Sequence, residues 1–107
     1  MTEAEITKQI REYLTQRGIF HFKVFQSGRG MGRAKRGVSD ILACYKGRFV
    51  AIEVKGRNGK ASDDQIKFLN DVNSAAGVAF IAKSVEDVEF WLNLKDWQDW
   101  HGTAQNT

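Results

Sequence analysis

The sequence has no proline, one cysteine, two histidines and no long run of apolar residues. A single cysteine excludes an internal disulfide, and no second His or Cys stands at metal-binding spacing from His21, so a zinc site is not supported. No apolar stretch approaches the roughly 18 residues that cross a bilayer, and no signal-peptide pattern is present. We therefore expect an intracellular protein in which Cys44 packs as a small hydrophobic residue in an apolar strand.

Acidic residues are scarce in the first 60 positions, where 13 Lys and Arg stand against 5 Asp and Glu, whereas from residue 61 onward the balance reverses to 3 against 8. This asymmetry suggests that a polyanion approaches the basic half, although a soluble surface with unevenly distributed charge is the alternative. The chain has 107 residues, and we expect one domain over 1–107 with its core over about 2–95. In the C-terminal tail, Trp97 and Trp100 are expected to cover apolar surface or a partner, and the last residues to be disordered.

Two short runs rich in Val, Ile, Phe and Tyr, residues 40–45 and 48–55, are joined by Lys46 and Gly47 and predict a β-hairpin. Because side chains alternate along a strand, Glu53 and Lys55 share one face. Pairing of the two strands brings Asp40 near both of them. Two close carboxylates repel unless a positive charge lies between them, and a hard divalent cation is the usual solution. The alternative is that these charges are simply solvated.

Capping residues and apolar periodicity predict the other elements. A helix over Ser62 or Asp63 to about Ala75 is expected to end at Gly77 and to turn Ile66, Phe68, Leu69 and Val72 toward the interior. The expected elements are, in order, a helix over 2–17 that Gly18 ends, strands over 19–25, 40–45 and 48–55, the helix just described, a strand over 78–82, and a helix from Ser84 through Leu94. A fourth strand reached through a helical crossover predicts a mixed sheet in an α/β sandwich.

Residues 26–37 form a predicted loop with four glycines, four basic residues and no acid. The loop lacks the G-K-[ST] ending of a phosphate-binding P-loop, so we expect it to contact nucleic-acid phosphates as a flexible arm, with a solvated surface loop as the alternative. Residues 56–60 form a second basic, glycine-bearing turn. The candidate DNA-binding residues of the two segments are Arg29, Arg33, Lys35, Arg36, Arg57 and Lys60.

Taken together, the motifs resemble one nuclease superfamily. An acid on the first helix, an acid opening the second strand, E-x-K on the third strand and a Gln on the next helix resemble the PD-(D/E)XK superfamily. The set is most similar to a stand-alone VRR-NUC (virus-type replication-repair nuclease) domain of phages and bacteria, over roughly residues 2–83. The residues that carry the resemblance are Thr2-Glu3, Gly37-Val38-Ser39-Asp40, Ile52-Glu53-Val54-Lys55-Gly56 and Gln65. Ser39 stands where the superfamily name has proline, and its presence removes no ligand.

The resemblance implies a restriction-endonuclease-like αβββαβ core and a Mg²⁺- or Mn²⁺-dependent endodeoxyribonuclease. By this resemblance, the metal is bound by Asp40, Glu53 and the Val54 carbonyl. Lys55 orients the attacking water and offsets transition-state charge, and Gln65 positions Lys55 or the nucleophile. The remaining implied residue is Glu3, acting through a water or a second metal, with Glu5 as its substitute.

The resemblance also implies a homodimer that cuts branched DNA such as four-way (Holliday) junctions, in a bacterial cytoplasm or that of a phage-infected host. Two-fold symmetry suits paired incision of a branched substrate. The alternative is a non-catalytic nucleic-acid-binding module with the same fold.

Overall fold

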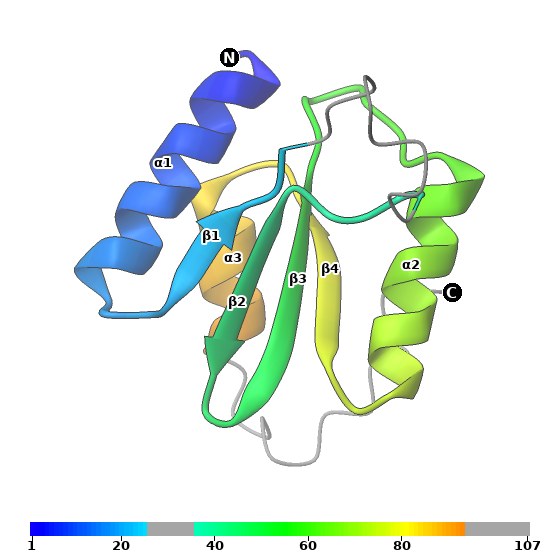
Figure 1. Ribbon diagram of the computed structural model, residues 1–107. Helices are drawn as coiled ribbons and strands as arrows, with labels where there is room; N and C mark the ends of the chain where they lie inside the picture. The colour runs from blue at the N-terminus through cyan, green and yellow to red at the C-terminus, as the bar shows by residue number, and fades with distance from the viewer. Residues whose placement is uncertain (26–35, 94–107) are drawn as a thin grey trace.

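The computed structural model describes residues 1–25 and 36–93. It contains a four-stranded sheet in the order β1-β2-β3-β4, in which β1, β2 and β3 pair antiparallel and β3 and β4 pair parallel (Figure 1). The predicted mixed sheet is therefore confirmed. The elements are α1 (Glu3–Gln16), β1 (His21–Lys23), β2 (Ile41–Tyr45), β3 (Arg48–Val54), α2 (Asp63–Ser74), β4 (Val78–Ala82) and α3 (Val85–Leu92). Leu94 and the tryptophans of the tail lie outside the described residues.

Helix α1 begins and ends where the sequence predicts. Thr2 is its N-cap, and a capping box joins Thr2 to Glu5: each side chain accepts a hydrogen bond from the other residue's backbone N–H. The stripe Ile6, Ile10 and Leu14 is buried. The helix stops before Gly18, whose φ of +69° is a left-handed conformation that glycine adopts without strain.

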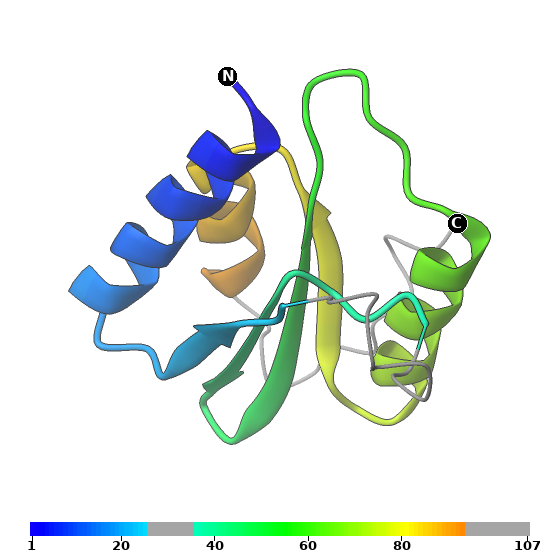
Figure 2. The ribbon, with the colours of Figure 1, turned by 45° about the horizontal axis from the view of Figure 1, so that its top comes forward.

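The helices lie on both faces of the sheet (Figures 1 and 2). Helices α1 and α3 cover one face, where they form a continuous apolar core with residues of the three longer strands, while α2 covers β3 and β4 on the other face. The core under α1 and α3 is large and includes Phe80, Ile41 and Ile52, whereas the core under α2 consists of Ala51, Leu69 and Ala79.

The hairpin forms as predicted. Lys46 and Gly47 both have positive φ, 52° and 78°, which is the backbone of a type I′ turn that matches the twist of the strands. At the start of β2, Gly37 also has positive φ, and a side-chain carbon there would collide with the backbone carbonyl of Asp64 in α2. A glycine is therefore required for the segment before Asp40 to pack against the first turn of α2.

Some expectations are wrong. Cys44 is exposed rather than packed, because it lies on the face that α2 covers only over β3 and β4. Ile66 is 36% exposed, and Asn73 instead is buried, where its side-chain amide pairs with both backbone polar groups of Ala79. Ala76, with φ of +70°, provides the left-handed residue after α2, in place of Gly77.

The first strand is also shorter than the predicted 19–25: β1 covers only His21–Lys23. On either side of it, single hydrogen bonds continue the pairing with β2, from the Cys44 amide to the Phe20 carbonyl and from the Val24 amide to the Asp40 carbonyl. The path of the chain is therefore the expected one, although the regular ladder is limited to three residues.

Candidate active site

Asp40 and Glu53 come together at one end of the sheet. The register pairs Ile41 with Ile52, which places Asp40 at the start of β2 beside Glu53 near the end of β3. The Val54 amide donates a hydrogen bond to Asp40 Oδ2 at 2.8 Å, so the carboxylate is held against the neighbouring strand. Glu53 is only 1% exposed. The hairpin thus delivers both predicted carboxylates to one point, one of them buried.

Lys55 and Gln65 complete the group around Glu53. The Lys55 Nζ lies 3.5 Å from Glu53 Oε2, and the lysine side chain is 14% exposed. The same oxygen accepts a hydrogen bond from Gln65 Nε2 at 3.0 Å. The structure therefore brings together four of the predicted site residues, from two strands and the following helix.

Gln65 reaches Glu53 because of the way α2 begins and packs. Its side-chain oxygen accepts a hydrogen bond from the Ser62 backbone amide in a second capping box, which leaves its NH₂ group to donate to Glu53. One turn later Leu69 packs with Ala51. Four helical residues advance about 6 Å and two strand residues about 6.6 Å, so the Leu69–Ala51 contact sets up the Gln65–Glu53 contact.

The positive charge around Glu53 is too small to offset the cost of ionising a buried carboxyl group. The pKa of Glu53 is raised to about 8, first by burial and then by the nearby Asp40, and Lys55 opposes both effects without cancelling them. Among the described residues, no N–H or O–H group donates a hydrogen bond to its buried Oε1 atom. A hard cation that takes carboxylate oxygens fits this pair, since it would satisfy the unpaired oxygen and stabilise the ionised form.

The helix carboxylate nearest the site is Glu3. Its Oε2 accepts a hydrogen bond from the Gly56 amide at 3.3 Å, just beyond Lys55. Glu5 is engaged in the cap of α1 instead. Within residues 1–25 and 36–93, no three His, Cys, Asp or Glu side chains gather closely enough to hold one metal ion. Glu3 therefore contacts the turn that follows Lys55, on the side of the site that faces α1.

The predicted DNA-binding residues are only partly described. Arg36, Arg57 and Lys60 are exposed, on segments that adjoin Asp40 and Lys55 along the chain. The Arg57 carbonyl accepts a hydrogen bond from Lys83 Nζ at 3.1 Å, which ties the loop after β3 to the end of β4. The other three residues of this set, Arg29, Arg33 and Lys35, lie outside the described residues.

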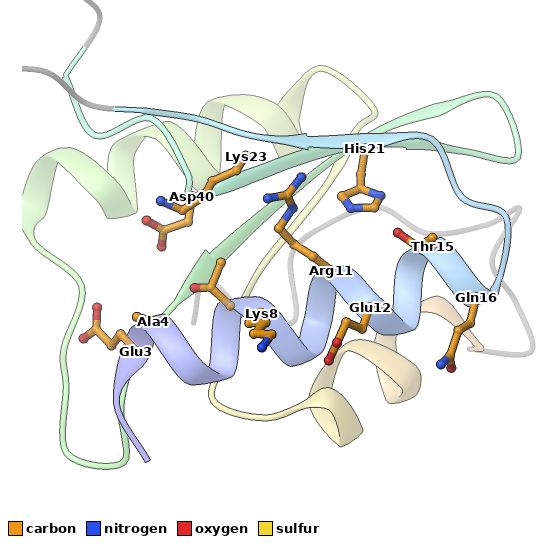
Figure 3. Close-up of a pocket in the computed structure, with 11 residues that line it drawn as sticks. Glu3, Ala4, Lys8, Arg11, Glu12, Thr15, Gln16, His21, Lys23 and Asp40 are labelled. Atoms are coloured by element: carbon orange, nitrogen blue, oxygen red, sulfur yellow. The ribbon is translucent and has the colours of Figure 1, made fainter.

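A groove between α1 and β1, with a volume of about 730 Å³, leads to Asp40 (Figure 3). Of the residues that line it, the sequence pointed only to Glu3 and Asp40, at one end. Arg11 from α1 and His21 and Lys23 from β1 contribute its nitrogen groups. The helix sequence alone indicates a polar stripe, because Arg11 lies four residues from both Thr7 and Thr15. Its position opposite β1 depends on how the helix packs, which the spacing does not specify.

Solved structures share this fold. No protein-family model matches the sequence, and no curated protein matches it either. A structure titled "VRR_NUC domain" superposes with a TM-score of 0.65 at 22% identity, covering 84% of this chain and 94% of the other. Another, titled "VRR_NUC domain protein", has a TM-score of 0.65 at 18% identity and covers 82% of each chain. The chain therefore has the VRR-NUC, restriction-endonuclease-like fold that the motifs predict.

Proposed function

We propose that this chain, which has the VRR-NUC fold, is a metal-dependent endonuclease that hydrolyses phosphodiester bonds in DNA. The observation that carries the proposal is Glu53: a buried carboxyl group, beside Asp40 and Lys55, whose Oε1 accepts no hydrogen bond from the described residues. A buried acid of this kind is costly for the fold and is typical of a functional site.

Asp40, Glu53 and the Val54 carbonyl are the proposed metal ligands. When bound there, Mg²⁺ or Mn²⁺ supplies Lewis-acid polarisation of the phosphate and neutralises negative charge. All three are oxygen ligands, which suit such hard cations. In the chain itself, the Val54 amide holds Asp40 in place from one side, and Gln65 holds Glu53 from the other. Gln65 is thus a positioning residue, because it acts through Glu53.

Lys55 is the proposed catalytic cation. Its ammonium group lies at the edge of the carboxylate pair, where it can donate a hydrogen bond to an attacking water and stabilise the charge that develops on the phosphate. Glu3 accepts a hydrogen bond from the Gly56 amide, next to Lys55 in the chain. From this position we assign Glu3 to orient a water or to bind a second metal.

The proposed substrate is branched DNA, including four-way junctions, cut by a homodimer. The resemblance in the motifs is the main support. A two-fold dimer presents two sites, which suits paired cuts across a branch. The excess of Lys and Arg in the half of the chain that contains the site also supports a polyanionic substrate.

The Lys55→Ala variant tests the assignment of the reaction. Wild-type protein with Mg²⁺ or Mn²⁺ should cut at least one of a panel of linear, flapped, splayed and four-way DNAs, and a chelator should stop it. Lys55→Ala should slow single-turnover cleavage about 10² to 10³-fold, because a preorganised donor to the transition state is lost. DNA affinity should change little.

Lys67→Ala is the matched control. Lys67 is an exposed lysine on α2 that pairs with Asp71 at 2.9 Å, so its loss removes the same charge away from the site, and cleavage should stay at the wild-type rate. A wild-type protein that binds branched DNA but cuts none of it with either metal would instead be a non-catalytic binding module. The mass of the protein in solution, measured alongside, tests the dimer.

A further inference from the structure

The groove between α1 and β1 has features that the proposed reaction does not use. It extends from Asp40 along the inner side of α1, and Figure 3 shows Arg11 rising from the helix toward β1. The Nε atom of Arg11 is buried and has no hydrogen-bond partner among the described residues. A guanidinium that is partly withdrawn from water and not paired with an acid is a site for an anion.

The two walls of the groove present donors to the same space. On the helix, Thr7, Arg11 and Thr15 recur every four residues, about 6 Å apart along the axis. Across from them stand His21 and Lys23 of β1. The residues Lys8, Glu12 and Gln16 also border the groove, but Figure 3 shows their side chains pointing away from β1.

His21 and Lys23 are held so that they can contribute to the groove. His21 Nδ1 lies 3.0 Å from the Ile19 carbonyl and donates to it, which leaves Nε2 for another partner, as an acceptor in the neutral ring and as a donor in the imidazolium. Lys23 Nζ lies 4.6 Å from the centre of the Phe25 ring, an arrangement that a solvated lysine can leave at small cost. The acids of the groove lining other than Glu12 are Glu3 and Asp40, which lie at its active-site end.

The size and lining of the groove indicate which anion fits. Its volume is that of a site for a small molecule or a short stretch of one strand, not of a duplex. Proteins that hold bases of single strands stack them on aromatic side chains, whereas the only ring in this lining is the imidazole of His21. The donors therefore suit phosphates and sugars, which carry no sequence information.

We propose that the groove between α1 and β1 binds the sugar-phosphate backbone of a single DNA strand that leaves the duplex at a branch point, with Arg11 contacting a phosphate next to the one that is cut. This inference rests on the proposed nuclease function, because the groove opens at Asp40. It gives the selection of flapped and splayed DNA a physical basis, because only a strand free of its complement can enter the groove.

Binding of two DNAs by the Arg11→Ala variant tests this. One DNA is a duplex with splayed single-stranded arms and the other is a blunt duplex of the same length. Fluorescence anisotropy in a chelator removes cleavage from the measurement. Arg11→Ala should weaken binding of the splayed DNA about tenfold and reduce the slope of log affinity against log salt by about 0.7, while the blunt duplex binds as before.

Lys67→Ala should change neither affinity, and Arg11→Lys, which keeps the charge, should retain the wild-type slope. The proposal fails if Arg11→Ala leaves splayed-DNA binding unchanged, or weakens both DNAs equally. It also fails if both Arg11 variants melt at lower temperature and neither alters the salt slope, since Arg11 is then structural. A wild-type protein that cuts no DNA would overturn the nuclease proposal. The binding comparison is made in a chelator, so its result is separate from the result on cleavage.

Discussion

The face of the sheet under α1 and α3 buries large side chains completely, whereas under α2 the larger side chains, such as Phe68 and Ile81, are only partly buried. On the first face Phe80 is fully buried and stacks on Trp91 of α3, with ring centres 5.8 Å apart. On the second face the buried apolar residues are Ala51, Ala79 and Leu69 of the helix, and Glu53 and Asn73 are buried as well. Among the described residues, no helix is long and apolar enough to cross a membrane.

The difference teaches where stability and chemistry are located. Large buried hydrocarbons contribute most to stability, so the face under α1 and α3 supplies most of it. Alanines on the other face let α2 approach closely, and this approach is what places Gln65 at Glu53. The cost of burying an acid therefore falls on the side of the molecule that contributes less to stability.

The largest expected effect comes from truncating the large-residue face. Phe80→Ala should lower the free energy of unfolding by about 3–5 kcal/mol, because it removes a buried ring and leaves a cavity. Phe49→Ala is the matched control, on the neighbouring strand and the opposite face, where the ring is 47% exposed; it should cost no more than about 1 kcal/mol. Denaturant unfolding measures both. Equal losses in the two variants would contradict the contrast between the faces.

A smaller effect should follow pH on the other face. The pKa of Glu53 is raised from 4.5 to about 8, so between these values the folded protein binds a proton that the unfolded chain has released. The stability of the metal-free protein should therefore fall as pH rises from about 5 to 8. Thermal melting with a chelator across this range checks the sign, and added Mg²⁺ or Mn²⁺ should stabilise more at pH 8 than at pH 6.

Glu53→Gln is the control for that pH dependence. It keeps the shape of the side chain and removes the buried charge, so the variant should lose the pH dependence and be more stable than wild type at pH 8, by about 1–3 kcal/mol. It should not cut DNA. A variant that melts with the same pH dependence as wild type would show that another group titrates.

The smallest expected effect is a difference in cleavage rate between variants of the two capping boxes, in α1 and in α2. Glu5 and Gln65 hold equivalent positions in α1 and α2, but only Gln65 also contacts the site. Gln65→Glu keeps a capping carbonyl oxygen and replaces the donor by a second carboxylate against Glu53, so cleavage should fall about tenfold. Glu5→Gln keeps its cap as well and should cut at the wild-type rate. Cleavage lost equally in both variants would mean that helix capping, and not the contact with Glu53, is responsible.

Local patterns in the sequence determined much of the fold and the centre of the site. The turn at Lys46 and Gly47 fixes the register of the hairpin, and a register with period two then fixes which side chains meet. Asp40, Glu53 and Lys55 could therefore be placed together from their spacing. The N-caps Thr2 and Ser84 were also predicted, and Ser62 was one of two candidates with Asp63, because capping depends on residues within one turn.

Only the tertiary structure decided what depends on packing between elements distant in the sequence. The contact between Glu3 and the Gly56 amide depends on where the turn after β3 meets α1. The exposure of Cys44 depends on how far α2 extends across the sheet. The burial of Glu53 and the groove beside Arg11 arise in the same way, because burial and cavities are properties of surfaces brought together in space and not of spacing along the chain.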